Sequence, residues 1–359
     1  MEALKAIVYR FDITGEVAGV EPLGNGLIND TYKVITSGNG PDYVLQRINN
    51  AIFKDVELLQ HNIEAVTDHI RKKLVSEGEK DLDRKVLRYV KVKGGDATYC
   101  CVDGKYWRVS VFIKDAFTYE AVTPEDSYYA GKAFGNFEAM LADIPEKLGE
   151  TIPDFHNMEL RLRQLDEAVA EDKAGRLSLP ESESILGFIR EHQEEMCKAE
   201  RLHREGKLPK RICHCDTKVN NMMFDDKGNV LCVIDLDTVM PSFVFSDFGD
   251  FLRTGANTVA EDDPAIDKVS FRMDIFEPFA KGYLESTASF LTPVEKENLP
   301  YGVLLFPFMQ AVRFFTDYLN GDTYYRIKYP DHNLVRTRNQ IALFKSALSK
   351  FDLITAIFE

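Results

Sequence analysis

A change of pattern near residue 114 constrains the fold more than any other feature of the sequence. Before it, short β-rich runs such as 42–48 alternate apolar and polar residues between glycine-containing turns. The exception is 56–74, where apolar residues recur every three or four positions, as on a helix with one buried face. We expect these residues to form a five-stranded antiparallel sheet carrying one helix, with strands within 21–35, 42–48, 86–92, 99–102 and 106–113.

After residue 114 the pattern becomes helical. Thr123-Pro-Glu-Asp126 combines an N-cap, a first-turn proline and two first-turn acids, and predicts a helix to Leu141. A strand-rich island at 212–239 interrupts further helices expected at 160–170, 184–202, 271–283, 300–319 and 337–351. The sequence therefore predicts an α+β fold with two lobes, an N-terminal lobe of residues 1–113 and a mainly helical lobe of residues 114–359.

Composition narrows the range of partners. The 359 residues include 44 Lys and Arg against 58 Asp and Glu, a net charge of −14. A chain of that charge repels polyanions, so we expect no nucleic-acid partner. The longest apolar run, 301–306, is far shorter than a membrane span, and the N-terminus has no small-residue cleavage site. We expect a cytoplasmic protein that does not enter the membrane; the sequence gives no oligomeric state.

The strand-rich island contains a motif with catalytic spacing. His214-Cys-Asp216 is followed by Asn221, the H-x-D-x-x-x-x-N spacing of a phosphotransferase catalytic loop. In such a loop the aspartate accepts the proton of an attacking hydroxyl, and the asparagine oxygen binds a magnesium ion on the nucleotide phosphates. We therefore expect Asp216 to be the catalytic base and Asn221 a metal ligand.

A hairpin should bring a second metal ligand to this loop. Residues 222–235 read as two strands around an Asp226-Lys-Gly-Asn229 turn, which would return Asp235 to Asn221 as a second oxygen ligand. The chain also contains Asp247-Phe-Gly249, the triplet that holds magnesium in protein kinases. No hairpin brings this triplet back to Asn221, so Asp247 is expected to cap and brace the catalytic loop instead of binding magnesium. Asp237 would share a strand face with Asp235 and is either a further contact or an exposed acid.

Cys213-His-Cys215 invites a zinc interpretation. In an extended segment the two sulfurs would face one side and the histidine the other, and no CxxC pair completes four ligands. We expect no zinc site and free cysteines.

The N-terminal lobe offers weaker signals for nucleotide binding. A glycine turn of Gly24, Asn25 and Gly26, followed by Asn29 and Thr31, would let backbone amides approach phosphates, although such turns are common. Arg47 stands where related enzymes place a cation for the phosphates, and Glu64 on the following helix is its expected ion-pair partner. No GxxxxGK[ST] loop is present, which excludes P-loop phosphotransferases.

Taken together, these residues resemble the aminoglycoside-phosphotransferase-like small-molecule kinases, which look like protein kinases without regulatory parts. Within that family the chain is similar over most of its length to the N-acetylhexosamine 1-kinases. The resemblance rests on 26–32, 43–49, 133–137, 155–156, 214–221, 233–241, 246–250 and 328–338, the last being specific to that group.

The resemblance implies a bilobal protein-kinase-like fold and Mg²⁺- and ATP-dependent phosphorylation of the anomeric hydroxyl of N-acetylglucosamine or N-acetylgalactosamine. It places the sugar against the helical lobe near Arg313 and Tyr324. Leu27 departs from the family pattern, which puts a sugar contact from the glycine loop in doubt. Other acceptors stay open, namely an aminoglycoside, choline or another amino alcohol, and so does a catalytically silent nucleotide-binding protein.

Overall fold

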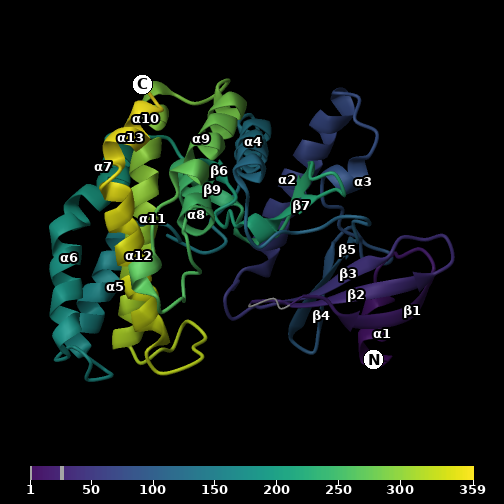
Figure 1. Ribbon diagram of the computed structural model, residues 1–359. Coiled ribbons are helices and arrows are strands. Elements are labelled where there is room, and N and C mark those ends of the chain that lie inside the picture. Colours follow the sequence, from purple (N-terminus) through teal and green to yellow (C-terminus); the bar gives the residue numbers. More distant parts are fainter. Residues whose placement is uncertain (1, 25–27) are drawn as a thin grey trace. The chain divides into compact units, whose positions relative to one another are not determined.

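The computed structural model describes residues 2–24 and 28–359, and the chain forms two compact units (Figure 1). Unit 1 comprises residues 1–118, 140–153 and 222–240, and unit 2 comprises residues 119–139, 154–221 and 241–359. A small antiparallel sheet and a mainly helical lobe give the expected α+β architecture. The boundary predicted between residues 113 and 114 stays a prediction.

Unit 1 contains a five-stranded antiparallel sheet in the order β1-β2-β3-β5-β4. Its strands are β1 (Glu16–Pro22), β2 (Asp30–Ser37), β3 (Tyr43–Ile48), β4 (Tyr99–Val102) and β5 (Lys105–Val111). The strand expected at 86–92 was wrong, because this segment makes only isolated bridges, from Tyr89 to Ser110 and from Val92 to Phe11. The alternating apolar residues there include Val86 and Val90, which are buried, but the backbone does not pair continuously with a neighbouring strand.

Among residues 2–24 and 28–118, three helices accompany this sheet, where the sequence predicted one. The expected helix is α2 (Val56–Ser76), whose N-cap Asp55 accepts a hydrogen bond from the backbone N–H of Leu58. The others are α1 (Glu2–Val8) and α3 (Leu82–Lys85). Ile7 and Val8 of α1 join the core of the sheet, but two buried residues in a seven-residue helix are too few to show a period.

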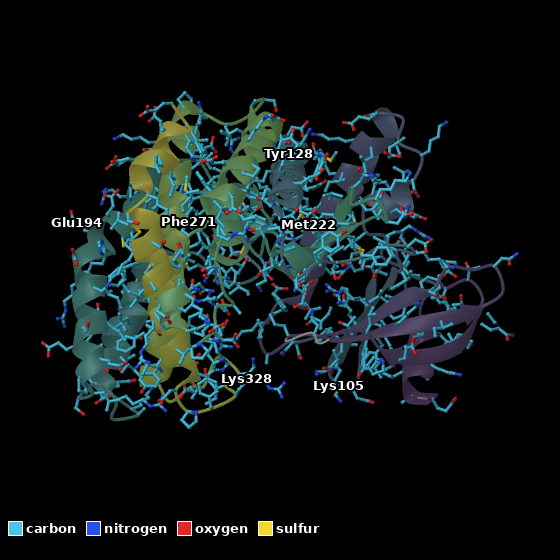
Figure 2. All side chains as sticks on the ribbon, in the orientation of Figure 1. Lys105, Tyr128, Glu194, Met222, Phe271 and Lys328 are labelled. Atoms are coloured by element: carbon cyan, nitrogen blue, oxygen red, sulfur yellow. The ribbon has the colours of Figure 1, made fainter. Side chains whose placement is uncertain are left out.

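The predicted hairpin in unit 1 is confirmed. β7 (Met222–Phe224) pairs antiparallel with β8 (Val230–Val233), and Met222, labelled in Figure 2, lies opposite Val233. Asp225 shapes the turn, because its carboxylate accepts the backbone N–H groups of Lys227 at 2.9 Å and Asn229 at 2.8 Å. The chain then enters the 3₁₀ turn η2 (Leu236–Thr238), so the second strand, expected to reach Asp235, ends at Val233.

Unit 2 is mainly helical, and each predicted helix has a counterpart, although the helix expected at 184–202 is two helices separated by Cys197 and the one expected at 337–351 ends at Leu348. They are α4 (Pro124–Leu141), α5 (Met158–Glu171), α6 (Pro180–Met196), α7 (Lys198–Arg204), α9 (Met273–Thr287), α11 (Leu299–Leu319) and α12 (His332–Leu348). The sequence missed α8 (Phe245–Gly255), α10 (Pro293–Glu297) and α13 (Phe351–Ala356). Figure 1 shows α12 beside α11, and α11 is apolar and buried on nearly all sides, as expected of a central helix.

Glycines set two close helix contacts in unit 2. A Cβ on Gly135 of α4 would lie 2.9 Å from the carbonyl oxygen of Tyr283, so α4 and α9 pack backbone to backbone there. Tyr128, labelled in Figure 2, lies on the same α4 helix. A Cβ on Gly249 would collide with the carbonyl oxygen of Gly302 on α11. The glycine of the Asp247-Phe-Gly249 triplet therefore serves helix packing on α8.

Short segments complete the chain. β6 (Arg211–Cys213) leads into the catalytic-loop motif and η1 (Val219–Asn221) ends it. β9 (Met240–Ser242) precedes α8, and η3 (Ile266–Lys268) precedes α9. No helix among residues 2–24 and 28–359 is long and apolar enough to cross a membrane.

Candidate active site

The catalytic-loop motif is held from beneath by Asp247 of α8. One carboxylate oxygen of Asp247 accepts the backbone N–H of His214 and the other accepts that of Cys215, each at 2.7 Å. The hydroxyl of Thr217 donates to the Asp247 backbone carbonyl, also at 2.7 Å. These bonds hold Cys215 at a φ of +63°, a conformation that L-residues adopt rarely. Asp247 thus braces the loop, as the sequence predicted.

Asp216 lies at the centre of this loop, with polar partners on both carboxylate oxygens. Lys218 Nζ lies 2.7 Å from Oδ1, and Asn221 Nδ2 donates to Oδ2 at 3.2 Å and to the Asp216 backbone carbonyl at 2.8 Å. Burial by itself would raise the pKa of Asp216, but the charge and hydrogen bond of Lys218 outweigh it and lower the pKa. Asp216 is therefore ionised at neutral pH and available as a proton acceptor.

Lys218 is a residue that the sequence reasoning missed. It stands two positions after Asp216 inside the recognised motif, so its position was visible in the sequence. Burial would lower the pKa of Lys218, but the charges of Asp216 and Asp250 raise it. Asp250 is also paired with buried Arg253, whose Nε lies 2.9 Å from its Oδ1. The loop is therefore surrounded by charges of both signs.

Asp235, the second expected magnesium ligand, follows β8 in unit 1. It adopts a left-handed conformation with φ of +59° and precedes η2. The predicted hairpin precedes it, with Met222 opposite Val233 and a register shift between Met223 and Phe224. The role of Asp235 as a metal ligand stays a prediction.

Asp237 is a buried ion-pair partner in unit 1, so the exposed-acid interpretation is wrong, whereas a contact with metal or substrate stays a prediction. It does not share a strand face with Asp235, since it lies in η2, and it is 3% exposed. Arg108 Nη2 of β5 lies 2.6 Å from its Oδ1, and Asn29 Nδ2 donates to its Oδ2 at 2.6 Å. Arg108 was missed because a single arginine in a strand usually points to solvent, and its partner lies 129 positions along the chain.

Two of the predicted nucleotide residues, Asn29 and Thr31, are hydrogen-bonded to members of the same network, Thr31 through Gln46, which accepts from Arg108 Nε at 3.0 Å. Asn29 also accepts the backbone N–H of Asn49 at 2.9 Å, and the Thr31 hydroxyl accepts Gln46 Nε2 at 3.2 Å. Gly24 has a φ of +70°, as a glycine turn requires. Asn25, Gly26 and Leu27 lie outside the described residues.

The expected pair of Arg47 and Glu64 is wrong. Arg47 Nε instead lies 2.6 Å from Asp30 Oδ2, directly across the β2–β3 ladder. Glu64 accepts a hydrogen bond from the hydroxyl of Thr98. Asp30 lies directly opposite Arg47 on the neighbouring strand, and only the strand register reveals this pairing. Any contact of Arg47 or Glu64 with a nucleotide stays a prediction.

Arg313 and Tyr324 lie together in unit 2, in the wall of a cavity of ≈ 360 Å³. The Arg313 guanidinium lies 5.3 Å from the ring centroid of Phe155 and 5.9 Å from that of Tyr324. Arg161 lines the same cavity, and burial lowers its pKa to about 10, with Arg313 adding to the effect. The wall thus combines aromatic rings with two guanidinium groups.

Asp317 of α11 fixes the loop that carries Tyr324. Its Oδ1 accepts the backbone N–H groups of Thr323 at 2.9 Å and Tyr324 at 2.8 Å, and its Oδ2 accepts that of Tyr325 at 3.0 Å. A single buried carboxylate therefore orders three successive residues, which explains how an exposed tyrosine keeps a defined place.

His156 follows Phe155, and its pKa is affected both by the arginines of this wall and by Asp216 of the catalytic loop. Its ring stacks on Phe155 with centroids 4.5 Å apart. Burial lowers its pKa well below the ordinary value, and the charges of Arg313 and Arg161 lower it further, whereas Asp216 acts in the opposite direction. His156 is therefore neutral and within electrostatic reach of both Arg313 and Asp216.

The cysteine-rich segment does not have the geometry first considered for zinc. Cys213 and Cys215 are buried free cysteines, and the positive φ of Cys215 means that the segment is not simply extended. Within the part of the chain that the structure describes, the group of possible metal-binding side chains that includes a cysteine is Glu138, Cys213 and Asp247. His214 is not a member of it.

The lobes and the braced loop define a kinase-like phosphotransferase, and comparison with known proteins agrees. Residues 19–279 match the model of the phosphotransferase enzyme family, APH, so the chain belongs to that family.

Solved structures share the fold at low sequence identity. A choline kinase from Cryptosporidium parvum Iowa II is 13% identical with a TM-score of 0.59, over 98% of this chain and 96% of that one. A choline/ethanolamine kinase family protein from Mesorhizobium loti is 16% identical with a TM-score of 0.56, over 100% and 99%. A spectinomycin phosphotransferase, solved with ADP and spectinomycin, is 12% identical with a TM-score of 0.55, over 99% and 98%.

Proposed function

We propose that this protein transfers a phosphoryl group from ATP to the anomeric hydroxyl of an N-acetylhexosamine, giving the sugar 1-phosphate. The observation that carries the proposal is Asp216, held ionised beside Lys218 and Asn221 on a loop braced by Asp247. Membership of the phosphotransferase family supports the reaction type. The sequence resemblance of 328–338 and the other stretches supports the sugar.

Asp216 would act on the acceptor hydroxyl. The carboxylate accepts the hydroxyl proton as the oxygen attacks the γ-phosphorus, and Lys218 offsets the charge on the same side. Phosphoryl transfer asks the protein mainly for positioning and charge neutralisation, so one fixed carboxylate and nearby cations suffice in kind. An anomeric hydroxyl is more acidic than an ordinary alcohol, which suits a base of lowered pKa.

Magnesium would be held by Asn221 and Asp235. Because Asn221 donates its amide nitrogen to Asp216, its amide oxygen is the metal-binding atom, and Asp235 supplies a carboxylate. Both are the hard oxygen ligands that Mg²⁺ takes beside phosphates. The bound ion would neutralise charge on the phosphates. ATP itself would contact Gly24, Asn25, Gly26, Asn29, Thr31 and Arg47, with Glu64 nearby.

The acceptor would bind in the cavity lined by Arg313 and Tyr324. Its volume of ≈ 360 Å³ suits a monosaccharide, and sugars present hydroxyl edges to a guanidinium and apolar faces to rings. The lining carries three cations and three carboxylates, namely Arg161, Lys173, Arg313, Glu167, Glu171 and Asp317, so its charge does not separate a sugar from a cationic acceptor such as choline, an amino alcohol or an aminoglycoside. The sequence resemblance at 328–338 is therefore the reason we place the sugar ahead of the acceptors named for the structural neighbours.

An ATP-consumption screen tests the proposal. The acceptors are N-acetylglucosamine, N-acetylgalactosamine, glucose, galactose, an aminoglycoside and choline, each with Mg²⁺ and with a chelator. We expect ATP consumption only with the N-acetylhexosamines and only with Mg²⁺. The product should have no reducing activity, because the phosphate blocks the anomeric carbon. Turnover with choline or the aminoglycoside alone would reject the acceptor, and a product that keeps its reducing end would reject the anomeric position.

A further inference from the structure

Beneath the catalytic loop, a second carboxyl meets the brace Asp247. Glu138, near the end of α4, is 2% exposed, and Asp247 is fully buried. One oxygen of each carboxyl and the sulfur of Cys213 all lie within 4.8 Å of one another. The backbone contact of α4 with α9 at Gly135 brings Glu138 to Tyr283, whose hydroxyl donates to Glu138 Oε2. Two buried acids therefore occupy one small polar site.

The donors at this site identify where a proton must lie. Both Asp247 oxygens accept backbone N–H groups, and Glu138 Oε2 accepts the Tyr283 hydroxyl. Glu138 Oε1 is buried and accepts from no donor within residues 2–24 and 28–359. A bare carboxylate oxygen next to a second carboxylate is strongly disfavoured in a buried site, whereas a protonated oxygen becomes a donor.

The electrostatics agree with this arrangement. Burial raises the pKa of Glu138 well above its ordinary value, and the charge of Asp247 and a hydrogen bond with it raise it further, while hydrogen bonds from the Tyr283 hydroxyl and the Cys213 thiol oppose the shift. Burial also raises the pKa of Asp247 to about 6, although the charge of His214 and the two backbone N–H bonds oppose the shift. The side chain that keeps its proton at neutral pH is therefore Glu138.

We propose that Glu138 and Asp247 share one proton, carried on Glu138 Oε1 and donated to the Asp247 carboxylate, and that this pair sets the position of the catalytic loop. Glu138 is then a positioning residue, which acts on Asp216 only through Asp247 and the backbone of His214 and Cys215. The kinetic part of this inference rests on the proposed kinase function, and the structural part does not.

A metal ion in the same site is the competing interpretation. Glu138, Cys213 and Asp247 are of ligand type, but both Asp247 oxygens are already used by backbone N–H groups at 2.7 Å. Burial also raises the pKa of the Cys213 thiol well above its ordinary value, which disfavours the thiolate that a metal needs. The observations favour the proton.

Titratable and charged groups on each packed element act on the pair. They are Asp247 and Asp250 on α8, Cys213 and Arg211 on β6, His214 and Cys215 on the loop, and Tyr283 on α9. The pair itself carries one negative charge. Loss of the shared proton would place two negative charges together, so native stability falls as the pH rises from the ordinary glutamate value toward the raised one.

Glu138→Gln is the decisive variant, since it is neutral, keeps a donor toward Asp247 and keeps an acceptor for Tyr283. Glu138→Leu loses both, and Glu125→Gln, at an exposed position on the same helix, controls for the charge removed. The melting temperature is measured from pH 6 to 9 with and without a chelator, and kcat and KM are measured at pH 7.

We expect Glu138→Gln to keep kcat and KM within about twofold, and Glu138→Leu to lower kcat at least about tenfold with a smaller effect on KM for ATP. Between pH 6 and 9 the melting temperature of Glu138→Gln should gain about 2–4 °C on the wild type, and Glu125→Gln should gain nothing.

Equal losses in Glu138→Gln and Glu138→Leu, a melting difference independent of pH, or destabilisation of the wild type by the chelator would each overturn the shared proton. The melting experiment needs no acceptor. If no acceptor is phosphorylated, the proposed function fails while the melting result still decides this inference.

Discussion

The two faces of the catalytic loop hold their acids differently, because Asp216 on one face is ionised, whereas on the other face Glu138 keeps a proton beside the ionised Asp247. On one face Asp216 is paired with Lys218, and its pKa is lowered even though burial opposes this. On the other, Asp247 and Glu138 are bound by backbone N–H groups and a tyrosine hydroxyl, and the pKa of both is raised by burial. A cation at contact distance can thus lower the pKa of a buried acid, whereas burial beside a second acid raises it.

The largest effect on turnover should follow from removing the charge of Asp216. Asp216→Asn keeps the shape of the side chain but cannot accept a proton at neutral pH. We expect kcat to fall by roughly 10²- to 10⁴-fold, the contribution of a positioned base, with ATP affinity nearly unchanged. Steady-state kinetics and nucleotide titration measure the two quantities. Near-normal turnover would remove Asp216 from the mechanism.

The buried pair of Arg108 and Asp237 in unit 1 tests whether a contacting cation also matters for the free energy of unfolding. Arg108→Met leaves Asp237 buried without its cation and should lower the free energy of unfolding by about 3–5 kcal/mol. Arg47→Met is the matched control on the neighbouring strand, because its partner Asp30 is exposed and the loss should be about 0–1 kcal/mol. Denaturant unfolding measures both. Similar losses would show that burial of the pair is unimportant.

The brace beneath the loop should matter for folding through its hydrogen bonds. Asp247→Ala leaves the buried N–H groups of His214 and Cys215 without acceptors, and we expect a loss of about 2–4 kcal/mol. Asp225→Ala removes an acceptor of two backbone N–H groups at the more exposed hairpin turn, where water can replace it. A loss in Asp247→Ala no greater than in Asp225→Ala would contradict the role of the brace.

The smallest effect should come from removing the charge of Lys218, the cation paired with Asp216. Lys218→Met leaves Asp216 without the charge that lowers its pKa, so the acid limb of the kcat/KM profile should move to higher pH. Lys207→Met, at a surface pair with Glu205, is the control and should leave the limb in place. A limb unchanged in Lys218→Met would mean that Lys218 does not set the charge of Asp216.

Much of the fold could be predicted because its signals are local. The periods of α2 and α11 and the turn residues of the β7–β8 hairpin all lie within short windows of sequence. The short helix α1 and the segment at 86–92 could not be predicted, since two buried residues show no period and alternation does not distinguish a bridge from a ladder.

Asp216 and Asn221 share one loop, so their spacing could indicate them in the sequence. Asp247 was predicted as the brace because no hairpin returns it to that loop, whereas the pairing of Arg108 with Asp237 appears only in the folded chain. The pairing of Arg47 with Asp30 depends on strand register, which the sequence left open. The partnership of Glu138 with Asp247 depends on the glycine contact between α4 and α9, for which a sequence gives no sign.

The account is tested most directly by ³¹P NMR of a reaction containing ATP, Mg²⁺ and N-acetylglucosamine, with wild-type protein and with Asp216→Asn side by side. We predict a new phosphorus signal coupled to the anomeric proton of the sugar with the wild type, and none in the same time with the variant. No sugar phosphate from the wild type, or the same signal at the same rate from the variant, would contradict it.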